Sequence, residues 1–236
     1  MDKDILYLKE LAAQKGIELS ETQLLQFATY SLMLREWNEK MNLTAIKEPR
    51  EIAVKHFYDS LLFLANCDIP KGARVIDVGT GAGFPGVVLK IARPDIDLTL
   101  LDSLNKRLVF LGELLKALNL TATLVHSRAE ESAKPPMRES FDIATARAVA
   151  ALPALCEYCI PYVKVGGSFV AMKGPSVKEE AEAAAKAVKL LGGSEFTVLT
   201  EHLPEGDERC FAVAKKVSQT PTKYPRNSAK ITKSPL

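Results

Sequence analysis

The sequence predicts an α/β fold in which a helical region precedes a seven-stranded, mostly parallel sheet. Three observations predict it. Residues 1–67 carry apolar side chains at helical spacing, whereas from residue 74 onward short β-rich runs alternate with helical stretches, the pattern of a doubly wound sheet. A glycine-rich turn at residues 79–86 follows the first β-rich run. The last two runs flank Pro204-Glu205-Gly206-Asp207, whose turn chemistry predicts an antiparallel hairpin.

The first part of the chain is expected to form three helices. The first covers residues 4–15, and Ser20 and Gln23 form a capping box that opens a long second helix. A third helix is expected from residue 50 to residue 64. We therefore assign residues 1–67 to an N-terminal helical extension, residues 68–217 to the α/β domain and residues 218–236 to a basic, flexible tail.

The strands of the α/β domain are predicted from short runs of apolar and β-branched residues bounded by polar or turn residues. They cover residues 74–78, 97–101, 122–125, 142–145, 167–172, 196–203 and 209–215. The first five alternate with helical stretches, so they are expected to pair in parallel. The last two are expected to close the sheet as a hairpin.

Composition narrows the class of protein. Hydrophobic residues make up 47% of the chain and charged residues 25%, which is ordinary for a globular protein. The formal charge is only +2, so any nucleic-acid surface must be local. No apolar run reaches the length of a membrane span, and the N-terminus lacks the layout of a signal peptide. We expect a cytoplasmic protein without a membrane segment.

The cysteines do not predict a metal centre. The chain has 4 cysteines, and two of them form Cys156-x-x-Cys159. No second pair of cysteines or histidines completes a tetrahedral set. The motif lies in an apolar helical stretch, where free thiols are commonly buried. We therefore expect structural cysteines and no bound metal.

The glycine-rich turn predicts a nucleotide-like cofactor at the end of the first strand. Gly79, Gly81 and Gly83 follow the apolar run directly. Glycine adopts positive φ and has no Cβ to block an approaching ligand. The helix that follows points its N-terminal N–H groups towards the same place.

Two cofactors are compatible with this turn. Gly81-x-Gly83-x-x-Gly86 matches the dinucleotide fingerprint, whereas Gly79-x-Gly81-x-Gly83 is the loop expected for S-adenosylmethionine (AdoMet). Asp77, two residues before the loop, suits a cationic sulfonium better than a pyrophosphate. Asp102 ends the second strand, where an acid binds ribose hydroxyls of either cofactor. The long helical region before the loop also favours AdoMet, but an NAD-dependent oxidoreductase stays open.

A set of independent motifs carries a resemblance over nearly the whole chain. They are WNEKMNLT (37–44), HFYDSL (56–61), FPGV (84–87), LDSLNKR (101–107), SRAE (127–130), ARA (146–148) and KG (173–174). Through these motifs the chain resembles the bacterial 16S ribosomal RNA guanine-N7 methyltransferases of the RsmG (GidB) family. One departure is Ala146, where the family often has serine.

The resemblance implies a class I AdoMet-methyltransferase (Rossmann-like) fold and methyl transfer to guanine N7 in the 530 loop of 16S rRNA, in the 30S ribosomal subunit, forming 7-methylguanosine. It implies that Gly79 and Phe84 contact AdoMet, that Asp102 binds the ribose, that Ala129 and Glu130 frame the adenine edge and that Arg147 faces the cofactor cleft. The complete set of cofactor-contact candidates is Asp77, Gly79, Gly81, Gly83, Phe84, Asp102, Ser103, Leu104, Ala129, Glu130 and Arg147.

The chemistry implied for N7 agrees with what the chain lacks. N7 of guanine carries a lone pair and no proton, so positioning and electrostatics suffice and no general base is expected. The chain has no Asn/Asp-Pro-Pro-aromatic motif of the enzymes that methylate exocyclic amines; its Pro135-Pro136 is wrongly flanked. We therefore predict no catalytic acid or base.

Polar residues outside the sheet are candidates for contacts with RNA. They are Asn38, Asn42, His56, Asp59, Lys173, Lys223 and Arg226. Asn42 could instead cap a helix, and His56 and Asp59, three residues apart, could form a local pair. A basic, proline-containing tail could follow a phosphate backbone. A monomer is expected, and a non-catalytic RNA-binding protein of ribosome assembly is the remaining alternative.

Overall fold

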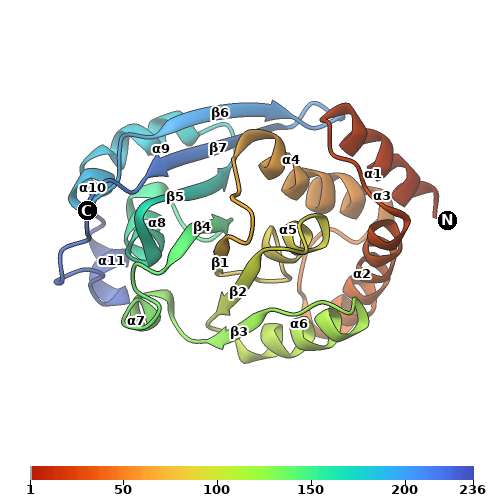
Figure 1. Ribbon diagram of the computed structural model, residues 1–236, viewed down its shortest axis with the longest axis horizontal. Coiled ribbons are helices and arrows are strands. Elements are labelled where there is room, and N and C mark those ends of the chain that lie inside the picture. The colour runs from red at the N-terminus through yellow and green to blue at the C-terminus, as the bar shows by residue number, and fades with distance from the viewer. Residues whose placement is uncertain (1) are drawn as a thin grey trace.

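The computed structural model describes residues 2–236. Its centre is a seven-stranded sheet with the order β3-β2-β1-β4-β5-β7-β6, and helices cover both faces (Figure 1). The strands are β1 (Arg74–Val78), β2 (Asp97–Asp102), β3 (Thr123–His126), β4 (Phe141–Arg147), β5 (Val163–Lys173), β6 (Thr197–His202) and β7 (Glu208–Lys215).

The helices before the sheet are α1 (Lys3–Gln14), α2 (Glu21–Met41), α3 (Pro49–Ile52), the π-helical η1 (Ala53–Tyr58) and α4 (Asp59–Asn66). Those between and after the strands are α5 (Gly86–Ala92), α6 (Asn105–Ala117), α7 (Ala129–Ser132), α8 (Leu152–Cys159), the 3₁₀-helical η2 (Ile160–Tyr162), α9 (Val177–Ala183), α10 (Ala185–Leu190) and α11 (Ser228–Lys233).

Strand directions confirm the predicted fold class. Strands β1 to β5 pair in parallel, while β7 is antiparallel to both β5 and β6. The carboxyl ends of β1, β2, β4 and β5 therefore meet at one edge of the sheet. Because β6 is antiparallel to β7, it runs in the direction of β5, and the β6–β7 turn lies at this same edge.

The N-terminal helices share a hydrophobic core with the sheet. Leu34 of α2 and Phe57 of η1 are buried in the same cluster as Val87 of α5 and Leu111 of α6. A second cluster, on the other face, packs α8, α9 and α10 against the sheet. Each fully buried side chain of this size contributes about 1.5–3 kcal/mol, so the helical extension is an integral layer of one structure.

The predicted capping box at the start of α2 is confirmed, and its Gln23 also contacts the end of α5. Gln23 N donates to Ser20 Oγ (3.3 Å), and Ser20 N donates to Gln23 Oε1 (2.8 Å). Gln23 Nε2 also donates to the carbonyl of Ile91 (2.8 Å), an otherwise unpaired group at the end of α5. The residue that starts α2 therefore also docks α2 against the sheet.

The third predicted helix is present but not uniform. It runs through α3, η1 and α4, so the predicted helix from 50 to 64 contains a π-helical segment that the sequence pattern did not reveal. Wider π turns of this kind are frequent at functional sites. His56 lies within η1, and Asp59 begins α4.

The C-terminal residues differ from the flexible tail that the sequence suggested. Tyr224 and Ile231 are buried. The Arg138 guanidinium donates to the carbonyls of Thr220 (2.7 Å) and Tyr224 (2.7 Å). Unpaired main-chain oxygens gain strong partners in this way, so the segment is held against the α/β domain although its composition is typical of disorder.

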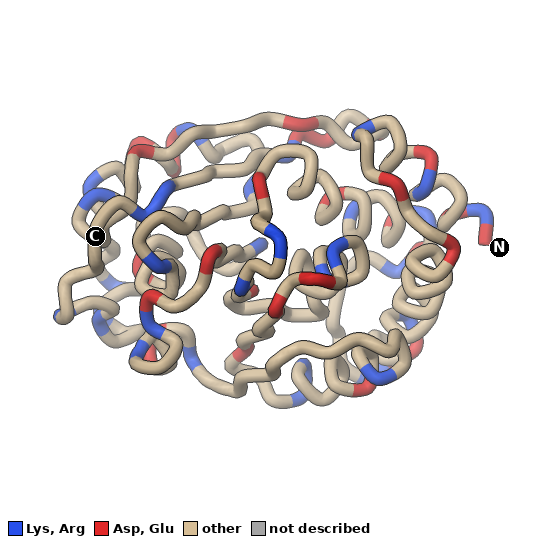
Figure 2. Tube along the Cα trace, viewed as in Figure 1, with Lys and Arg blue, Asp and Glu red and all other residues tan. Residues whose placement is uncertain are grey.

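Residues 2–236 contain no helix that is both long enough and apolar enough to span a bilayer. Basic and acidic residues alternate along the whole trace rather than separating onto different parts of it (Figure 2). A positively charged site must therefore be built locally, from a few side chains.

Candidate functional site

The glycine loop at the end of β1 is open on one side and closed on the other. Gly79, Gly81 and Gly83 have φ angles of 71°, 60° and 100°, where L side chains are strained. A Cβ on Gly81 would have no heavy atom nearer than 3.9 Å, whereas a Cβ on Gly83 would lie 2.6 Å from Tyr30 Oη. Gly81 therefore leaves its backbone open to a ligand, and Gly83 lets α2 approach the loop.

Asp77 folds this loop and does not face a ligand. Its Oδ2 accepts hydrogen bonds from Thr80 Oγ1 (2.7 Å) and Gly86 N (2.9 Å), and the residue is fully buried. Burial raises the pKa of Asp77 to about 6 because the charged form loses its hydration. The interpretation of Asp77 as a direct partner of a cationic cofactor is thus replaced by a role in holding the loop.

Asp102 lies beside the loop at the carboxyl end of β2. Its Oδ2 accepts from Gly81 N (2.9 Å), and its Oδ1 accepts from Leu104 N (2.9 Å). Arg107 Nη1, from the first turn of α6, lies 3.2 Å from Oδ2. The carboxylate is therefore fixed where an acid at the end of a second strand meets ribose hydroxyls.

The residues expected around the adenine follow the neighbouring strand. Ala129 and Glu130 begin α7 directly beyond β3, and Tyr162 Oη donates to the Ala129 carbonyl (2.6 Å). The carbonyl of Ser103 lies 3.1 Å from His126 Nε2, which ties the ends of β2 and β3 together. The structure thus brings the predicted ribose and adenine residues to one edge of the sheet.

Phe84 is sandwiched between two aromatic side chains of the N-terminal helices. Its ring stacks on Tyr30 (centroids 5.3 Å apart, 8° between planes) and on His56 (4.4 Å, 21°). Tyr30 Oη donates to the carbonyl of Ala82 (2.6 Å). The Phe84 side chain is 5% exposed, so it supports the loop from behind. Sequence reasoning missed Tyr30, which reads only as one member of an apolar helical stripe.

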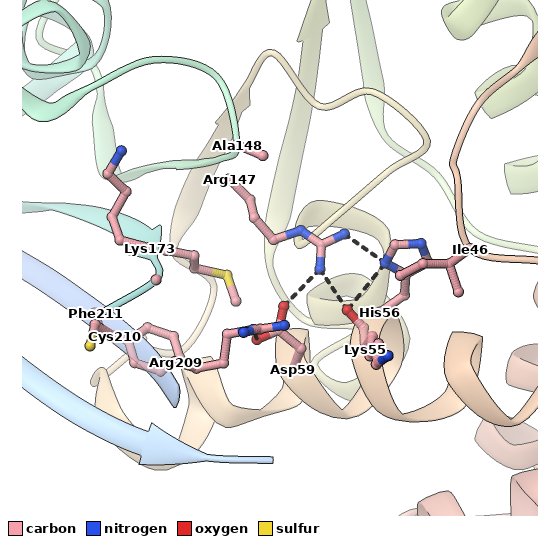
Figure 3. Close-up of a pocket in the computed structure, with 12 residues that line it drawn as sticks. Ile46, Lys55, His56, Asp59, Arg147, Ala148, Lys173, Arg209, Cys210 and Phe211 are labelled. Carbon is pink, nitrogen blue, oxygen red and sulfur yellow. Dashed lines mark hydrogen bonds and ion pairs between the residues drawn. The ribbon is translucent and has the colours of Figure 1, made fainter. Parts of the chain in front are cut away.

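Arg147, at the end of β4, reaches across to η1 and α4 (Figure 3). Its Nη1 donates to Asp59 Oδ2 (2.8 Å) and to the carbonyl of Lys55 (3.1 Å). Its Nη2 lies 3.0 Å from His56 Nδ1. The alternative of a local pair between His56 and Asp59 does not hold, because Arg147 binds both residues.

These contacts determine the state of His56. His56 Nδ1 lies 3.0 Å from Arg147 Nη2 and 3.2 Å from the Lys55 carbonyl. Arginine only donates hydrogen bonds, so the shorter contact assigns Nδ1 as the acceptor, and Nε2–H then donates to Thr44 Oγ1 at 2.8 Å. Burial, together with the charge of Arg147, lowers the pKa of His56 to about 3. His56 is therefore neutral, and both of its ring nitrogens are engaged.

Asp59 holds a second arginine. Its Oδ1 lies 3.2 Å from Arg209 Nε, at the start of β7, and the carboxylate is buried. Burial raises the pKa of Asp59, and the guanidiniums of Arg147 and Arg209 oppose that rise. Sequence reasoning missed Arg209; its only signal is its position directly after the acidic turn of the last hairpin.

A cavity of about 370 Å³ lies between these groups and the ends of β4 and β5. This volume is at the lower end of the range for small-molecule sites. Its lining residues are Ile46, Lys55, His56, Asp59, Arg147, Ala148, Met172, Lys173, Gly174, Arg209, Cys210 and Phe211. Four cationic side chains from four separate elements, η1, β4, β5 and β7, thus line one cavity (Figure 3).

Lys173 lines this cavity but is held internally. Its Nζ donates to the carbonyl of Ala150 (2.8 Å) and pairs with Glu180 Oε2 (2.7 Å). The same carboxylate oxygen accepts from Leu152 N (2.9 Å). Lys173 therefore fixes the loop between β4 and α8 and shapes the wall of the cavity.

The two asparagines act through the backbone. Asn38 Nδ2 donates to the Thr44 carbonyl (2.9 Å) and its Oδ1 accepts from Thr44 N (2.9 Å). Asn42 ends α2 in the left-handed conformation, with φ 50°, so it caps the helix as the alternative interpretation held. Asn38 reaches the site only indirectly, because Thr44 in turn contacts His56.

Lys223 and Arg226 are not brought to this site. Arg226 is paired with Glu157, a fully buried carboxylate of α8, through Nη2 at 2.8 Å. Lys223 is exposed, with its Nζ 5.3 Å from the centre of the Tyr224 ring. The segment is anchored by Arg138, which precedes β4 and so lies at the opposite edge of the sheet from the cavity.

Comparison with known proteins identifies the family. Residues 23–209 match the family model described as GidB, rRNA small subunit methyltransferase G. The chain is 48% identical over 232 residues to the Ribosomal RNA small subunit methyltransferase G of Desulforamulus reducens, covering 97% of each chain. It is 49% identical over 245 residues to the protein of the same name from Acetivibrio thermocellus, covering 100% of each.

Solved structures agree on the fold. A predicted O-methyltransferase from Agrobacterium tumefaciens superposes with a TM-score of 0.56 at 19% identity, over 68% of this chain and 81% of that chain. A SAM-dependent O-methyltransferase from Thermotoga maritima gives 0.55 at 17% identity, over 80% of this chain and 72% of that chain. The fold is that of the methyltransferases, and the chain belongs to the rRNA small subunit methyltransferase G (GidB) family.

Proposed function

We propose that this protein transfers a methyl group from AdoMet to N7 of a guanine in the 530 loop of 16S rRNA. The observation that carries the proposal is the bonding state of the cavity beside the glycine loop. His56 is neutral with both ring nitrogens engaged, and Asp59 is paired with two arginines. Both ring nitrogens of His56 are thus occupied, two guanidiniums hold Asp59, and N7 of guanine has no proton to lose.

The residues around the glycine loop fit AdoMet. The open side of Gly81 admits a ligand to the backbone, and Asp102 stands next to it for the ribose hydroxyls. Ala129 and Glu130 frame the adenine edge beyond β3. AdoMet, when bound, supplies an electrophilic methyl group on a sulfonium sulfur. Gly81 and Asp102 would hold AdoMet at the glycine loop, and Asp77 and Tyr30 brace this loop from behind.

The cavity suits a flipped-out guanine. Arg147 is a hydrogen-bond donor of the kind that recognises the O6 oxygen of guanine. Methyl transfer moves positive charge onto the purine. Asp59 places a buried carboxylate at this wall of the cavity, where it offsets that charge together with the charges of the arginines. Catalysis then rests on orientation and electrostatics.

The substrate follows from the family rather than from the geometry. Its members are named as methyltransferases of small-subunit ribosomal RNA, so 16S rRNA within the 30S subunit is the proposed acceptor. We further propose that the protein acts in the cytoplasm, as a monomer and without a metal ion.

The decisive experiment supplies methyl-labelled AdoMet and 30S subunits from cells that lack this gene, followed by analysis of digested 16S rRNA. Labelled 7-methylguanosine is expected with the wild type and is expected to be absent with Gly81→Val, whose side chain occupies the open face of the loop. Measurable AdoMet binding without transfer to 30S subunits, 16S rRNA or assembly intermediates would overturn the acceptor assignment.

A further inference from the structure

The turn between β6 and β7 carries two carboxylates at the mouth of the cavity. It contains Glu205 and Asp207 and lies at the same edge of the sheet as the carboxyl ends of β4 and β5. Glu205 Oε2 is 3.7 Å from Lys55 Nζ, and Asp207 Oδ2 is 3.9 Å from Arg209 Nη2. Both cations line the cavity.

In both ion pairs, Glu205 with Lys55 and Asp207 with Arg209, the carboxylate is more exposed than the cation. The carboxylate side chains of Glu205 and Asp207 are 50% and 51% exposed, whereas those of Lys55 and Arg209 are 24% and 26% exposed. The acids therefore lie on the solvent side of the cations, which is the side from which an RNA backbone must arrive. Figure 3 shows the Arg209 guanidinium directed towards Asp59, with the hairpin strand beneath it.

Each cation also has a partner that does not depend on the turn. Lys55 Nζ donates to Glu51 Oε1 (2.8 Å), one helical turn earlier, and Arg209 pairs with the buried Asp59. Glu51 and Asp59 hold Lys55 and Arg209 in place. Glu205 and Asp207 are thus not needed to position the cations, and their removal leaves the wall of the cavity intact.

We propose that Glu205 and Asp207 occupy the phosphate positions of Lys55 and Arg209 in the free protein, so that RNA must displace the turn's carboxylates to enter the site. Carboxylate and phosphate are alternative partners of the same ammonium and guanidinium groups. This inference rests on the proposed function, in which the cavity receives a nucleotide of RNA.

The two ion pairs weaken RNA binding without blocking it. Exposed ion pairs at such distances contribute little, about 0.2–1 kcal/mol each, so an RNA that makes many contacts displaces both carboxylates readily. The free energy of displacement is the same for every RNA that enters the cavity, so it lowers the affinity for each of them by the same factor. Only an RNA with enough further contacts then binds at low concentration.

The test replaces both acids by isosteric amides, Glu205→Gln with Asp207→Asn. A matched control, Asp97→Asn with Glu195→Gln, removes the same two charges from exposed ion pairs with Arg74 and Lys189. Asp97 begins β2 and Glu195 precedes β6, so both control sites lie at the opposite edge of the sheet.

Binding of each variant is measured to 30S subunits lacking the modification and to an unrelated single-stranded RNA, across a salt series. We expect the turn variant to bind unrelated RNA about threefold to tenfold more tightly at low salt. A similar gain is expected for 30S subunits, and a smaller gain is expected for the control variant on both RNAs. Equal gains for the turn and control variants, or no gain for the turn variant, would overturn the proposal.

Transfer of the methyl group is read separately in the same preparations. Wild-type protein that transfers no methyl group to 30S subunits, 16S rRNA or assembly intermediates contradicts the proposed function. Unchanged RNA binding in the turn variant, with transfer intact, contradicts only the role of Glu205 and Asp207. The two failures are therefore distinguishable.

Discussion

Arg147 and Asp59 form a 2.8 Å ion pair that joins the end of β4 to the start of α4. One residue belongs to the sheet and the other to the N-terminal helices, so the wall of the cavity exists only when both layers are assembled. Asp59 also pairs with Arg209, and one buried carboxylate thus orients two guanidiniums.

Asp59→Asn preserves the shape of this side chain and removes its charge. Both arginines lose their counter-charge, and the cavity becomes more positive as charge moves onto the acceptor base. We expect kcat to fall about 10- to 100-fold, by analogy with the loss of one preorganised electrostatic group, with AdoMet affinity changed less than about twofold. Steady-state kinetics and calorimetric titration measure the two effects. An unchanged kcat would show that Asp59 is dispensable for the chemistry.

Tyr30→Phe removes one hydroxyl from behind the glycine loop and keeps the stacked ring. Loss of the bond to the Ala82 carbonyl leaves a buried acceptor unsatisfied, at about 1–3 kcal/mol of unfolding free energy. AdoMet binding is expected to weaken as the loop loses its support. Tyr7→Phe, which removes a hydroxyl from α1, is the matched control. Equal denaturation midpoints for the two variants would argue against the bracing role.

Asp102→Ala tests the ribose assignment. Ribose hydroxyls and the amide of Gly81 lose their acceptor, so AdoMet is expected to bind more weakly by about 1–3 kcal/mol. Asp97→Ala, at the other end of β2, removes an exposed carboxylate from the same strand and is expected to leave AdoMet affinity unchanged. Identical AdoMet dissociation constants for the two variants would show that Asp102 does not bind the ribose.

His56 makes stability depend on pH in a defined direction. Its pKa falls from 6.5 to about 3 in the folded protein, so between these values the unfolded chain binds more protons and stability declines as pH is lowered. The loss attributable to His56 is about 2 kcal/mol between pH 6.5 and pH 5. Asp77, with its pKa raised to about 6, acts in the opposite direction, so wild-type protein alone does not isolate the effect.

The effect of His56 is therefore read as a difference. The free energy of unfolding of the wild type minus that of His56→Gln, measured by chemical denaturation, is expected to shrink as pH falls from 6.5 to 5. A difference that stays constant over this interval would mean that His56 titrates normally in the folded protein.

Arg226→Gln tests the anchoring of the C-terminal segment. It removes the guanidinium from the buried carboxylate of Glu157, which keeps only the main-chain N–H of residue 226 (2.6 Å). Loss of the charged partner of a buried carboxylate destabilises proteins by about 3–5 kcal/mol. Lys223→Gln, three residues earlier and exposed, is expected to change stability by less than about 0.5 kcal/mol. If both substitutions changed the free energy of unfolding by similarly small amounts, the C-terminal segment would be flexible, as its composition suggested.

Sequence patterns predicted the sheet well because its signals are local. Each strand was placed within a few residues, and the turn at Pro204–Asp207 was recognised from its own residues. The tail was misjudged for the opposite reason. Arg226 looks like a solvated cation until Glu157, 69 positions earlier, is seen to be buried beside it. Nothing near Glu157 in the chain marks it as buried.

The site was predicted unevenly for the same physical reason. Gly81 and Asp102 were found because a strand end followed by glycine or an acid is a local signature. Arg209 and Tyr30 were missed because each becomes significant only through a partner distant in sequence, Asp59 and Ala82. His56, Asp59 and Arg147 were all candidates from the sequence, but the contacts by which Arg147, at the end of β4, binds the other two were not predicted.

The contact between Tyr30 and Gly83 limits how far this protein can be dissected. A side chain on Gly83 would collide with Tyr30 Oη, so the cofactor loop and α2 are shaped to one another. The α/β part is therefore not a transplantable module. A chain shortened to residues 68–217 would expose the apolar faces of α5 and α6 and leave the ring of Phe84 bare on both sides. Cofactor binding therefore depends on an intact N-terminal layer, and the two cannot be separated by truncation.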